Sequence, residues 1–238
     1  MGFDLLRMSV AENIALVQEK IAAAARRAGR SVEEITLMGV SKKVEVARMR
    51  EAYCADLRVF GENRVQEFSA KAEALRDLQA EWHMIGHLQS NKAAKAAELF
   101  SAVDSIDSLH LAEKINAAAQ SLGKKLPVLI EVNIGGEAVK SGAAPESEEL
   151  EKILRAAPEL QCLQICGLMT VPPFTDDPES ARPYFQRMRE LRERIAGRKL
   201  PSVAMDVLSM GMSHDFEIAI EEGATCVRIG TAIFGERK

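Results

Sequence analysis

Short apolar runs alternate with helical patterns from residue 35 to the end of this chain of 238 residues. Strands that alternate with helices predict parallel βαβ units. Eight such units in a chain of this length suit a closed TIM barrel, which typically takes about 250 residues. An open doubly wound sheet usually carries a glycine-rich turn after its first strand, whereas that turn here is SKKVE. We therefore expect an α/β fold in which residues 1–238 form a single (β/α)8 TIM-barrel domain.

An extra amphipathic helix is expected over 8–29, because apolar residues recur there at helical spacing. The expected strands are 35–42, 58–63, 81–88, 102–106, 127–134, 163–171, 203–210 and 225–234. In TIM barrels the active site lies at the C-terminal ends of the strands. The residues at those predicted ends are Lys42, Glu62, Asn63, His87, Asn133, Met169, Thr170, Ser209, Arg228, Gly230 and Thr231. Because most of them are polar in otherwise apolar runs, we expect them to converge on one mouth.

The composition limits the partners that this chain can have. Its formal net charge is −4, and no lysine- or arginine-rich block accompanied by aromatic residues is present, which argues against nucleic acid. The N-terminus lacks the apolar region of a signal peptide, and no apolar run approaches the length of a membrane span. Cys54, Cys162, Cys166 and Cys226 lie in or beside apolar runs and form no CxxC pair. We interpret them as reduced core thiols and expect a cytoplasmic protein with no membrane partner.

Lys42 stands at the end of the first expected strand, in the sequence ITLMGVSKK. On a strand, Met38, Val40 and Lys42 share one face. An ammonium at the end of an apolar stripe is costly to desolvate, and burial shifts a lysine toward the neutral amine. A neutral amine is what Schiff-base chemistry with a carbonyl or with pyridoxal phosphate needs. The alternative is a solvated lysine that only marks the end of the strand.

The last two expected units carry features that suit an anion. SMGMS at 209–213 puts Ser209 and Ser213 just before a helix, where backbone N–H groups can point at a phosphate. In RIGT at 228–231, Gly230 permits close approach of the backbone to a ligand and Thr231 adds a hydroxyl. Arg228 then binds the phosphate or faces a pyridine nitrogen. The alternative is that Ser213 only caps the helix that follows.

The histidines give little support to a metal site. His83 and His87 are four residues apart, but HMIGH lacks the glutamate of an HExxH motif and Gly86 weakens a helix there. We expect His87 to form hydrogen bonds near the mouth, His83 to be structural, and His110 and His214 to lie on the surface. Ser-His-Asp catalysis has no anchoring motif, since GxSxG is absent.

Several motifs in register resemble one known family, the YggS/PROSC pyridoxal phosphate homeostasis proteins, over roughly residues 8–235. The motifs are VSK at 40–42, FGENRVQE at 60–67, WHMIGHLQSNK at 82–92, EVNIGGEAVKSG at 131–142, GLMTVPP at 167–173, LSMGMS at 208–213 and VRIGTAIFG at 227–235. Members of this family are similar to the barrel of alanine racemase, so the resemblance implies an alanine racemase N-terminal domain-like fold.

The resemblance implies a site for pyridoxal 5′-phosphate, held as a Schiff base on Lys42. It implies phosphate contacts from Ser209 or Ser213 with Gly230 and Thr231. Arg228 matches an arginine that approaches the ring nitrogen, where it keeps that nitrogen unprotonated and makes the ring a poorer electron sink. Asn63 and His87 match positions near the cofactor, and Lys140 is a candidate second lysine near the mouth.

The chain departs from the family's usual sequence at two positions. Lys43 follows the expected anchor where the family usually has TKP, but strand alternation turns Lys43 away from the mouth. His214 stands where an acidic residue is common, which changes the charge near the phosphate but not its backbone donors.

Three functions remain open on the sequence. The resemblance implies a protein that binds pyridoxal 5′-phosphate for intracellular homeostasis or delivery, with apo pyridoxal-phosphate enzymes as possible recipients, no established catalysis and a monomeric or dimeric state. The second reading is a racemase or lyase of low activity. Alanine racemases take a tyrosine base from a partner subunit, whereas this chain has only Tyr53 and Tyr184, neither at an expected strand end. The third is an aldolase that uses Lys42 directly on a carbonyl substrate.

Overall fold

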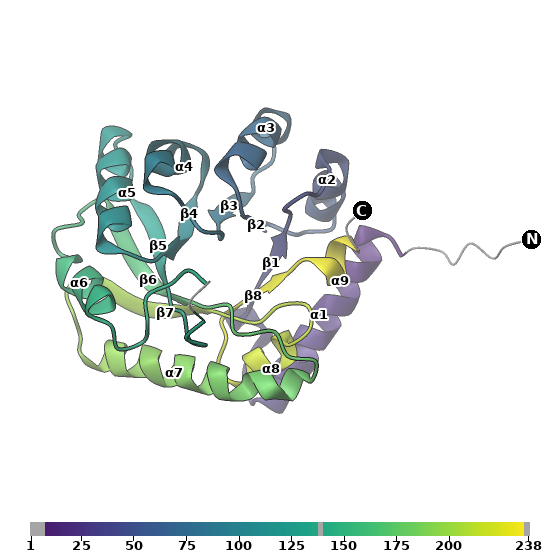
Figure 1. Cartoon of the computed structure of the whole chain (residues 1–238). Coiled ribbons are helices and arrows are strands. Elements are labelled where there is room, and N and C mark those ends of the chain that lie inside the picture. Colours follow the sequence, from purple (N-terminus) through teal and green to yellow (C-terminus); the bar gives the residue numbers. More distant parts are fainter. Residues whose placement is uncertain (1–7, 138–139, 236–238) are drawn as a thin grey trace, which may run out of the picture.

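A computed structural model describes residues 8–137 and 140–235. Its strands form one closed barrel in the order β1 to β8, and every neighbouring pair is parallel. Figure 1 shows the helices as an outer ring around this barrel. The predicted TIM barrel is therefore confirmed, while a single domain over the whole chain stays a prediction because part of the chain lies outside the described residues.

The strands and helices alternate as the sequence pattern predicts. The strands are β1 (Thr36–Val40), β2 (Val59–Glu62), β3 (Glu81–Met84), β4 (Ala102–Ile106), β5 (Leu126–Glu131), β6 (Leu163–Met169), β7 (Val203–Ser209) and β8 (Cys226–Ile229). The helices are α1 (Val10–Arg27), α2 (Val46–Cys54), α3 (Val65–Leu75), α4 (Ala93–Leu99), α5 (Leu109–Ser121), α6 (Glu148–Ala156), α7 (Arg182–Gly197), α8 (Phe216–Glu221) and α9 (Thr231–Phe234). Short 3-10 turns occur at Val32–Glu34, Ser90–Lys92 and Pro178–Ala181.

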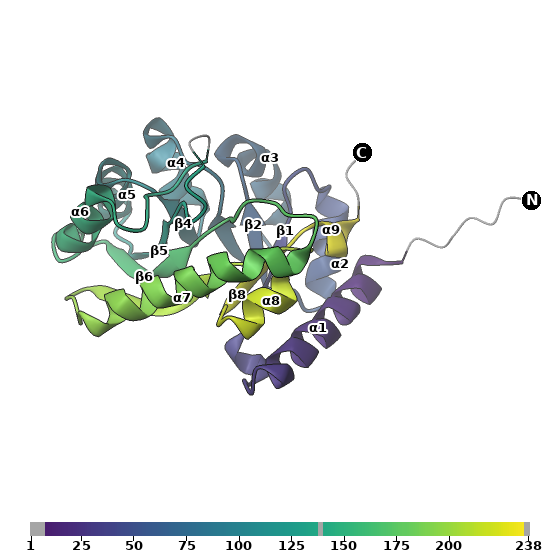
Figure 2. The same cartoon turned by 60° about the horizontal axis from the view of Figure 1, so that its bottom comes forward.

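The N-terminal helix α1 completes the outer ring. Up to residue 235, where the described part of the chain ends, only the one-turn helix α9 follows β8, and α1 packs against α8, α9 and α2 at that position. Figure 2 shows α1 along the outside of these elements. A capping box between Ser9 and Glu12 fixes where α1 begins. Its buried face carries Val10, Ile14 and Val17, so hydrophobic burial holds it on the barrel.

Side chains on the strands alternate between the barrel interior and the helix layer. Met38 of β1 lines an interior cavity. A Cβ on the next residue, Gly39, would lie 2.4 Å from Leu57 and 3.5 Å from Phe234, which belong to the packed outer layer. Lys42 continues the interior register of Met38 two residues beyond the end of β1. No helix in the described part of the chain is both long and apolar enough to cross a membrane.

Two of the expected strands run at least four residues too far. The strand expected over 81–88 ends at Met84, because the chain then passes so close to Asn63 that a Cβ on Gly86 would lie 2.4 Å from its carbonyl oxygen. The strand expected over 225–234 ends at Ile229. Gly230, at φ −107° and ψ −79°, turns the backbone into α9. In both places an apolar run continues beyond the strand and misled the prediction.

The interpretation of the four cysteines as core thiols is confirmed for Cys226 and wrong for Cys54. Cys226 is buried, but Cys162 and Cys166 are only partly buried and Cys54 is exposed. Cys54 is the last residue of α2, so its apolar neighbours face the core while its own side chain faces solvent.

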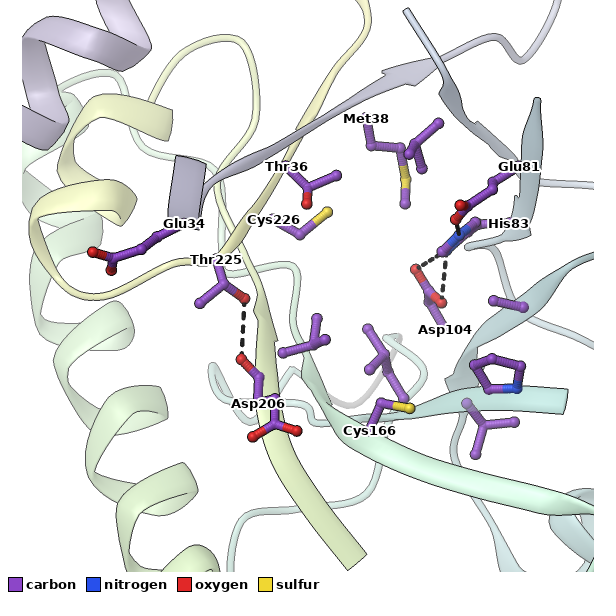
Figure 3. Close-up of a pocket in the computed structure, with 16 residues that line it drawn as sticks. Glu34, Thr36, Met38, Glu81, His83, Asp104, Cys166, Asp206, Thr225 and Cys226 are labelled. Atoms are coloured by element: carbon purple, nitrogen blue, oxygen red, sulfur yellow. Dashed lines mark hydrogen bonds and ion pairs between the residues drawn. The ribbon is translucent and has the colours of Figure 1, made fainter. Parts of the chain in front are cut away.

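A cavity of about 600 Å³ opens at the N-terminal end of the barrel, away from the C-terminal ends of the strands (Figure 3). His83 lies in it, with Nδ1 3.1 Å from Oδ2 of Asp104 and Nε2 3.6 Å from Oε2 of Glu81. Burial acts to lower the pKa of His83, but the two carboxylates outweigh this and raise the pKa above 6.5. The prediction that His83 has a structural place is consistent with this pairing.

This pair predicts a pH-dependent contribution to stability. Because the pKa of His83 is raised on folding, its contribution is fully present below about pH 6.5 and is lost as the pH rises through the folded-state value. We expect NMR titration to place the His83 pKa above the ordinary histidine value in the native protein and to lower it in the Asp104→Asn variant. An unchanged titration in folded Asp104→Asn protein would contradict the pairing.

Candidate functional site

The turn that carries Lys42 lies at the C-terminal end of β1. Ser41 to Val44 form a tight turn in which the Val44 N–H donates to the Ser41 carbonyl at 3.0 Å. Lys42 is half-buried and Lys43 is exposed. Lys43 has φ 58°, in the left-handed region that an L-residue other than glycine, asparagine or aspartate seldom adopts. The turn therefore presents two adjacent lysines in different environments, Lys42 partly buried and Lys43 exposed.

Arg228 is the one charged side chain among the predicted site residues that is fully enclosed by the barrel, with an exposure of 3%. Its Nη1 donates to Oγ of Ser209 at 2.7 Å, and its Nη2 donates to the Thr170 carbonyl at 2.7 Å. Burial lowers the pKa of Arg228, and the nearby Asp104, Glu131 and other acidic groups oppose that effect. The guanidinium is thus fixed between the ends of β6, β7 and β8, and Ser209 serves it as an acceptor.

Asn63 and His87 differ in what their side chains contact. Oδ1 of Asn63 is buried and has no hydrogen-bond partner within the described ranges. A buried amide oxygen without a partner costs free energy comparable to a lost hydrogen bond, so it marks a place where a donor from a ligand fits. The His87 side chain is 58% exposed, and its Nδ1 lies 3.3 Å from Oδ2 of Asp107.

Glu131, at the end of β5, is a buried carboxyl group that the sequence analysis did not single out. Its Oε2 atom is buried and finds no hydrogen-bond partner in the described part of the chain. Burial and the neighbouring Asp107 raise the pKa of Glu131, Arg228 opposes them, and the result is a pKa of about 7. Strand alternation along PVLIEVNI was available as a signal, but a raised pKa depends on the neighbours that the barrel brings together.

The raised pKa of Glu131 predicts a pH-dependent loss of stability. The native state holds this proton more tightly than the unfolded state, so the free energy of unfolding falls as the pH rises from about 4.5 to about 7. Because one pKa unit corresponds to 1.36 kcal/mol, Glu131→Gln should stabilise the cofactor-free protein by about 3 kcal/mol at pH 8. Urea unfolding at pH 4 and pH 8 checks this. An equal effect of the substitution at both pH values would refute it.

The loops after β7 and β8 meet at the same end of the barrel. Oγ of Ser213 accepts a hydrogen bond of 3.3 Å from the Ala232 N–H in the first turn of α9. The Met212 N–H donates to the Asp215 carboxylate at 2.7 Å and is therefore already paired. By contrast, the backbone N–H groups of Ser213 and Thr231 donate to no partner among the residues described here. TIM barrels commonly bind phosphate between these two loops and a short helix after strand 8.

Lys140 joins the loops that follow the neighbouring strands β5 and β6. Its Nζ donates to the Pro172 carbonyl at 3.0 Å and pairs with the Glu137 carboxylate. The side chain of Asn133 holds the base of this loop through hydrogen bonds to the Glu137 carbonyl at 2.8 Å and the Lys140 carbonyl at 3.3 Å. The predicted strand end at Asn133 thus lies within a structured loop rather than in the barrel.

The structure does not bring every predicted strand-end residue to one mouth. Glu62 is fully buried but lies on the outer side of β2, where its carboxylate contacts Ser41 and Lys71 of α3. The expectation that Glu62 joins the mouth is wrong, because strand alternation assigns Gly61 and Asn63 to the interior and Glu62 to the helix layer. His110 and His214 are exposed, as predicted.

Comparison with known proteins places the chain in a family. The family model for the N-terminal domain of alanine racemase matches residues 13–238. A pyridoxal phosphate homeostasis protein of Aquifex aeolicus is 48% identical over 231 residues, which cover 97% of this chain and 100% of the relative.

Two solved structures agree with this placement. PipY of Synechococcus elongatus, solved with PLP bound, is 35% identical, with a TM-score of 0.82, and the match covers 95% of this chain and 100% of PipY. An alanine racemase of Clostridium difficile shares the fold at 18% identity and a TM-score of 0.70 over 57% of its own length. The chain therefore belongs to the alanine racemase N-terminal domain family and, within it, to the pyridoxal phosphate homeostasis proteins.

Proposed function

We propose that this protein binds pyridoxal 5′-phosphate at the C-terminal mouth of its barrel, as a Schiff base on Lys42, and serves intracellular homeostasis and delivery of that cofactor. The observation that carries the proposal is the pair of loops after β7 and β8. The Ser213 hydroxyl joins them by accepting from the Ala232 N–H, and the Ser213 and Thr231 N–H groups have no acceptor among the residues that the structure describes. Lys42 lies in the turn that follows β1, the neighbour of β8 in the barrel. PipY, a 35% identical relative, was solved with PLP bound.

The donor set fits a phosphorylated aldehyde. The cofactor supplies an aldehyde that reacts with a primary amine and a pyridine ring that withdraws electrons from a bound group. In this proposal the N–H groups of Ser213 and Thr231, with Gly230 beside them, bind the phosphate. Ser209 and Thr170 orient the Arg228 guanidinium toward the ring nitrogen.

Two further polar residues, Asn63 and His87, belong to the same mouth in this proposal. Asn63 offers a buried oxygen without a described partner to a donor of the ligand. His87 and its partner Asp107 lie near the opening, with the His87 side chain largely exposed. We assign Asn63 and His87 to binding and orientation of the cofactor and of the amine that removes it.

A role without catalysis is supported by the positions of the tyrosines. The Tyr53 hydroxyl accepts a hydrogen bond from Gln79 N–H, and its ring lies under the Arg58 guanidinium in the helix layer. Tyr184 belongs to α7. Neither supplies the tyrosine base that racemisation on this scaffold would need. The competing function, a weak racemase, rests on Glu131, whose raised pKa suits a proton acceptor near neutral pH.

Visible absorption spectroscopy of the purified protein with added pyridoxal 5′-phosphate tests the proposal. We expect a visible band that borohydride bleaches, and peptide mapping should then find the reduced label on Lys42. Transfer of the cofactor to an apo pyridoxal-phosphate enzyme, with no racemisation of alanine above background, would support the carrier role. A protein that takes up no cofactor contradicts the binding proposal, and racemisation that Glu131→Gln abolishes contradicts the carrier role.

A further inference from the structure

A cluster of charged side chains lies behind the turn that carries Lys42. It consists of Glu62 at the end of β2 together with Glu67 and Lys71, which are one turn apart on α3. Nζ of Lys71 is 3.3 Å from Oε1 of Glu62 and 2.8 Å from Oε1 of Glu67. The side-chain exposures of Glu62, Lys71 and Glu67 are 0%, 14% and 23%. Such burial makes this cluster unlike an exposed helical ion pair, which contributes little.

The cluster holds both peptide groups of Lys42. Nζ of Lys71 donates to the Ser41 carbonyl at 3.2 Å, and this carbonyl belongs to the peptide bond that precedes Lys42. The N–H of Lys43, which belongs to the peptide bond that follows Lys42, donates to Oε1 of Glu67. The orientations of these two peptide planes define φ and ψ of Lys42. Side chains of one helix therefore fix the backbone from which the Lys42 side chain extends.

Glu62, at the end of β2, supports the same turn. Oγ of Ser41 donates to Oε1 of Glu62 at 2.8 Å, and the Ser41 N–H donates to the Gly61 carbonyl at 3.0 Å. Burial raises the pKa of Glu62, while Lys71 and Ser41 oppose that effect. A buried carboxylate and an ammonium in this arrangement cost desolvation energy. Lys71 and Glu67 use this arrangement to hold the two peptide groups of Lys42, and the contact of Glu67 also holds Lys43 at its left-handed φ of 58°.

We propose that Glu67 and Lys71, supported by Glu62, are positioning residues that clamp the backbone of Lys42 and thereby set how fast the cofactor is released. This inference rests on the proposed function, because it assumes the cofactor on Lys42. A fixed backbone keeps the amine in the orientation that the mouth requires and lowers the entropy cost of forming the bond again after it opens. A loosened turn allows Lys42 to leave that orientation and allows Lys43 to compete for the aldehyde.

Substitutions at Glu67 separate positioning from folding. Glu67→Leu removes the acceptor of the Lys43 N–H, whereas Glu67→Gln keeps an oxygen at that place. The matched control is Glu148→Leu, because Glu148 is also a first-turn glutamate and pairs with Lys152 at the same spacing, but its side chain is 80% exposed. Capture of the cofactor by excess hydroxylamine measures release. Since one hydrogen bond to a charged group is lost, we expect release from Glu67→Leu to be about tenfold faster, and release from Glu67→Gln and Glu148→Leu to be close to wild type.

Two further measurements distinguish the clamp from a general effect on stability. Hydrogen exchange of the Lys43 amide in the cofactor-free protein should be slow in wild type and in Glu67→Gln, and fast in Glu67→Leu. Borohydride mapping should find part of the label on Lys43 in Glu67→Leu but not in wild type. A folded Glu67→Leu protein with wild-type release and label only on Lys42 would overturn the clamp. A wild-type protein that binds no cofactor would instead overturn the proposed function, while the exchange of the Lys43 amide would still test the clamp geometry.

Discussion

Replacing Lys42 by methionine should abolish the visible band that pyridoxal 5′-phosphate gives with this protein, whereas Lys43→Met should keep it. Both variants remove one ammonium from the same turn, so their difference reports position alone. Lys42 is half-buried in the register of the barrel interior, and Lys43 is exposed at a left-handed φ with its N–H bound to Glu67. Loss of the covalent link should weaken binding at least about a hundredfold, because only the phosphate and ring contacts remain.

Absorption titration and borohydride mapping measure this difference. Circular dichroism melts of the cofactor-free variants serve as the control, and we expect both to unfold close to wild type because neither side chain is fully buried. A Lys42→Met protein that keeps the band, with the label on Lys43 or Lys140, would show that another lysine replaces Lys42. Loss of the band in Lys43→Met, with the band kept in Lys42→Met, would mean that Lys43 and not Lys42 forms the Schiff base.

The barrel was predictable because its signal is local and repeated. Each apolar run of strand length is followed by a helical pattern, and a parallel sheet buried on both faces needs both. The expectation that Lys42 faces the mouth rests on the same alternation, since Met38 lines the interior and Lys42 lies four residues later, and it stays a prediction. These inferences needed only the order of residues along the chain.

The parts that sequence reasoning missed depend on contacts between distant segments. IGHL after β3 and TAIF after β8 are apolar enough for strands, but close packing of Gly86 against Asn63 and the bend at Gly230 end the strands earlier. Glu62 was placed at the mouth because it precedes Asn63, although its parity assigns it to the helix layer. Glu131 was passed over within EVNIGG because its environment comes from Asp107 and Arg228, which lie on other parts of the barrel.

The largest effect on stability is expected at Arg228. Replacing it by methionine removes the hydrogen bonds to Ser209 and to the Thr170 carbonyl and leaves nearby carboxyl groups without their counter-charge. Removal of one partner from a buried charged network typically costs about 3–5 kcal/mol. For a protein of this size we expect the melting temperature to fall by roughly 10 °C. Thermal and urea unfolding of the cofactor-free protein measure this, and Arg76→Met is the control, since the Arg76 side chain is 75% exposed and pairs with the exposed Glu73.

The double variant Arg228→Met/Glu131→Gln identifies the origin of the loss. If the uncompensated carboxyl group of Glu131 causes part of it, Glu131→Gln should stabilise the Arg228→Met protein by about 1–3 kcal/mol more than it stabilises wild type at pH 8. At pH 5, where Glu131 is protonated in either background, this excess should be small. Strictly additive effects at both pH values would mean that Arg228 stabilises the barrel through Ser209 and Thr170 alone. If Arg228→Met is as stable as wild type, the buried network does not stabilise the barrel, because Arg228 then behaves like the exposed control Arg76.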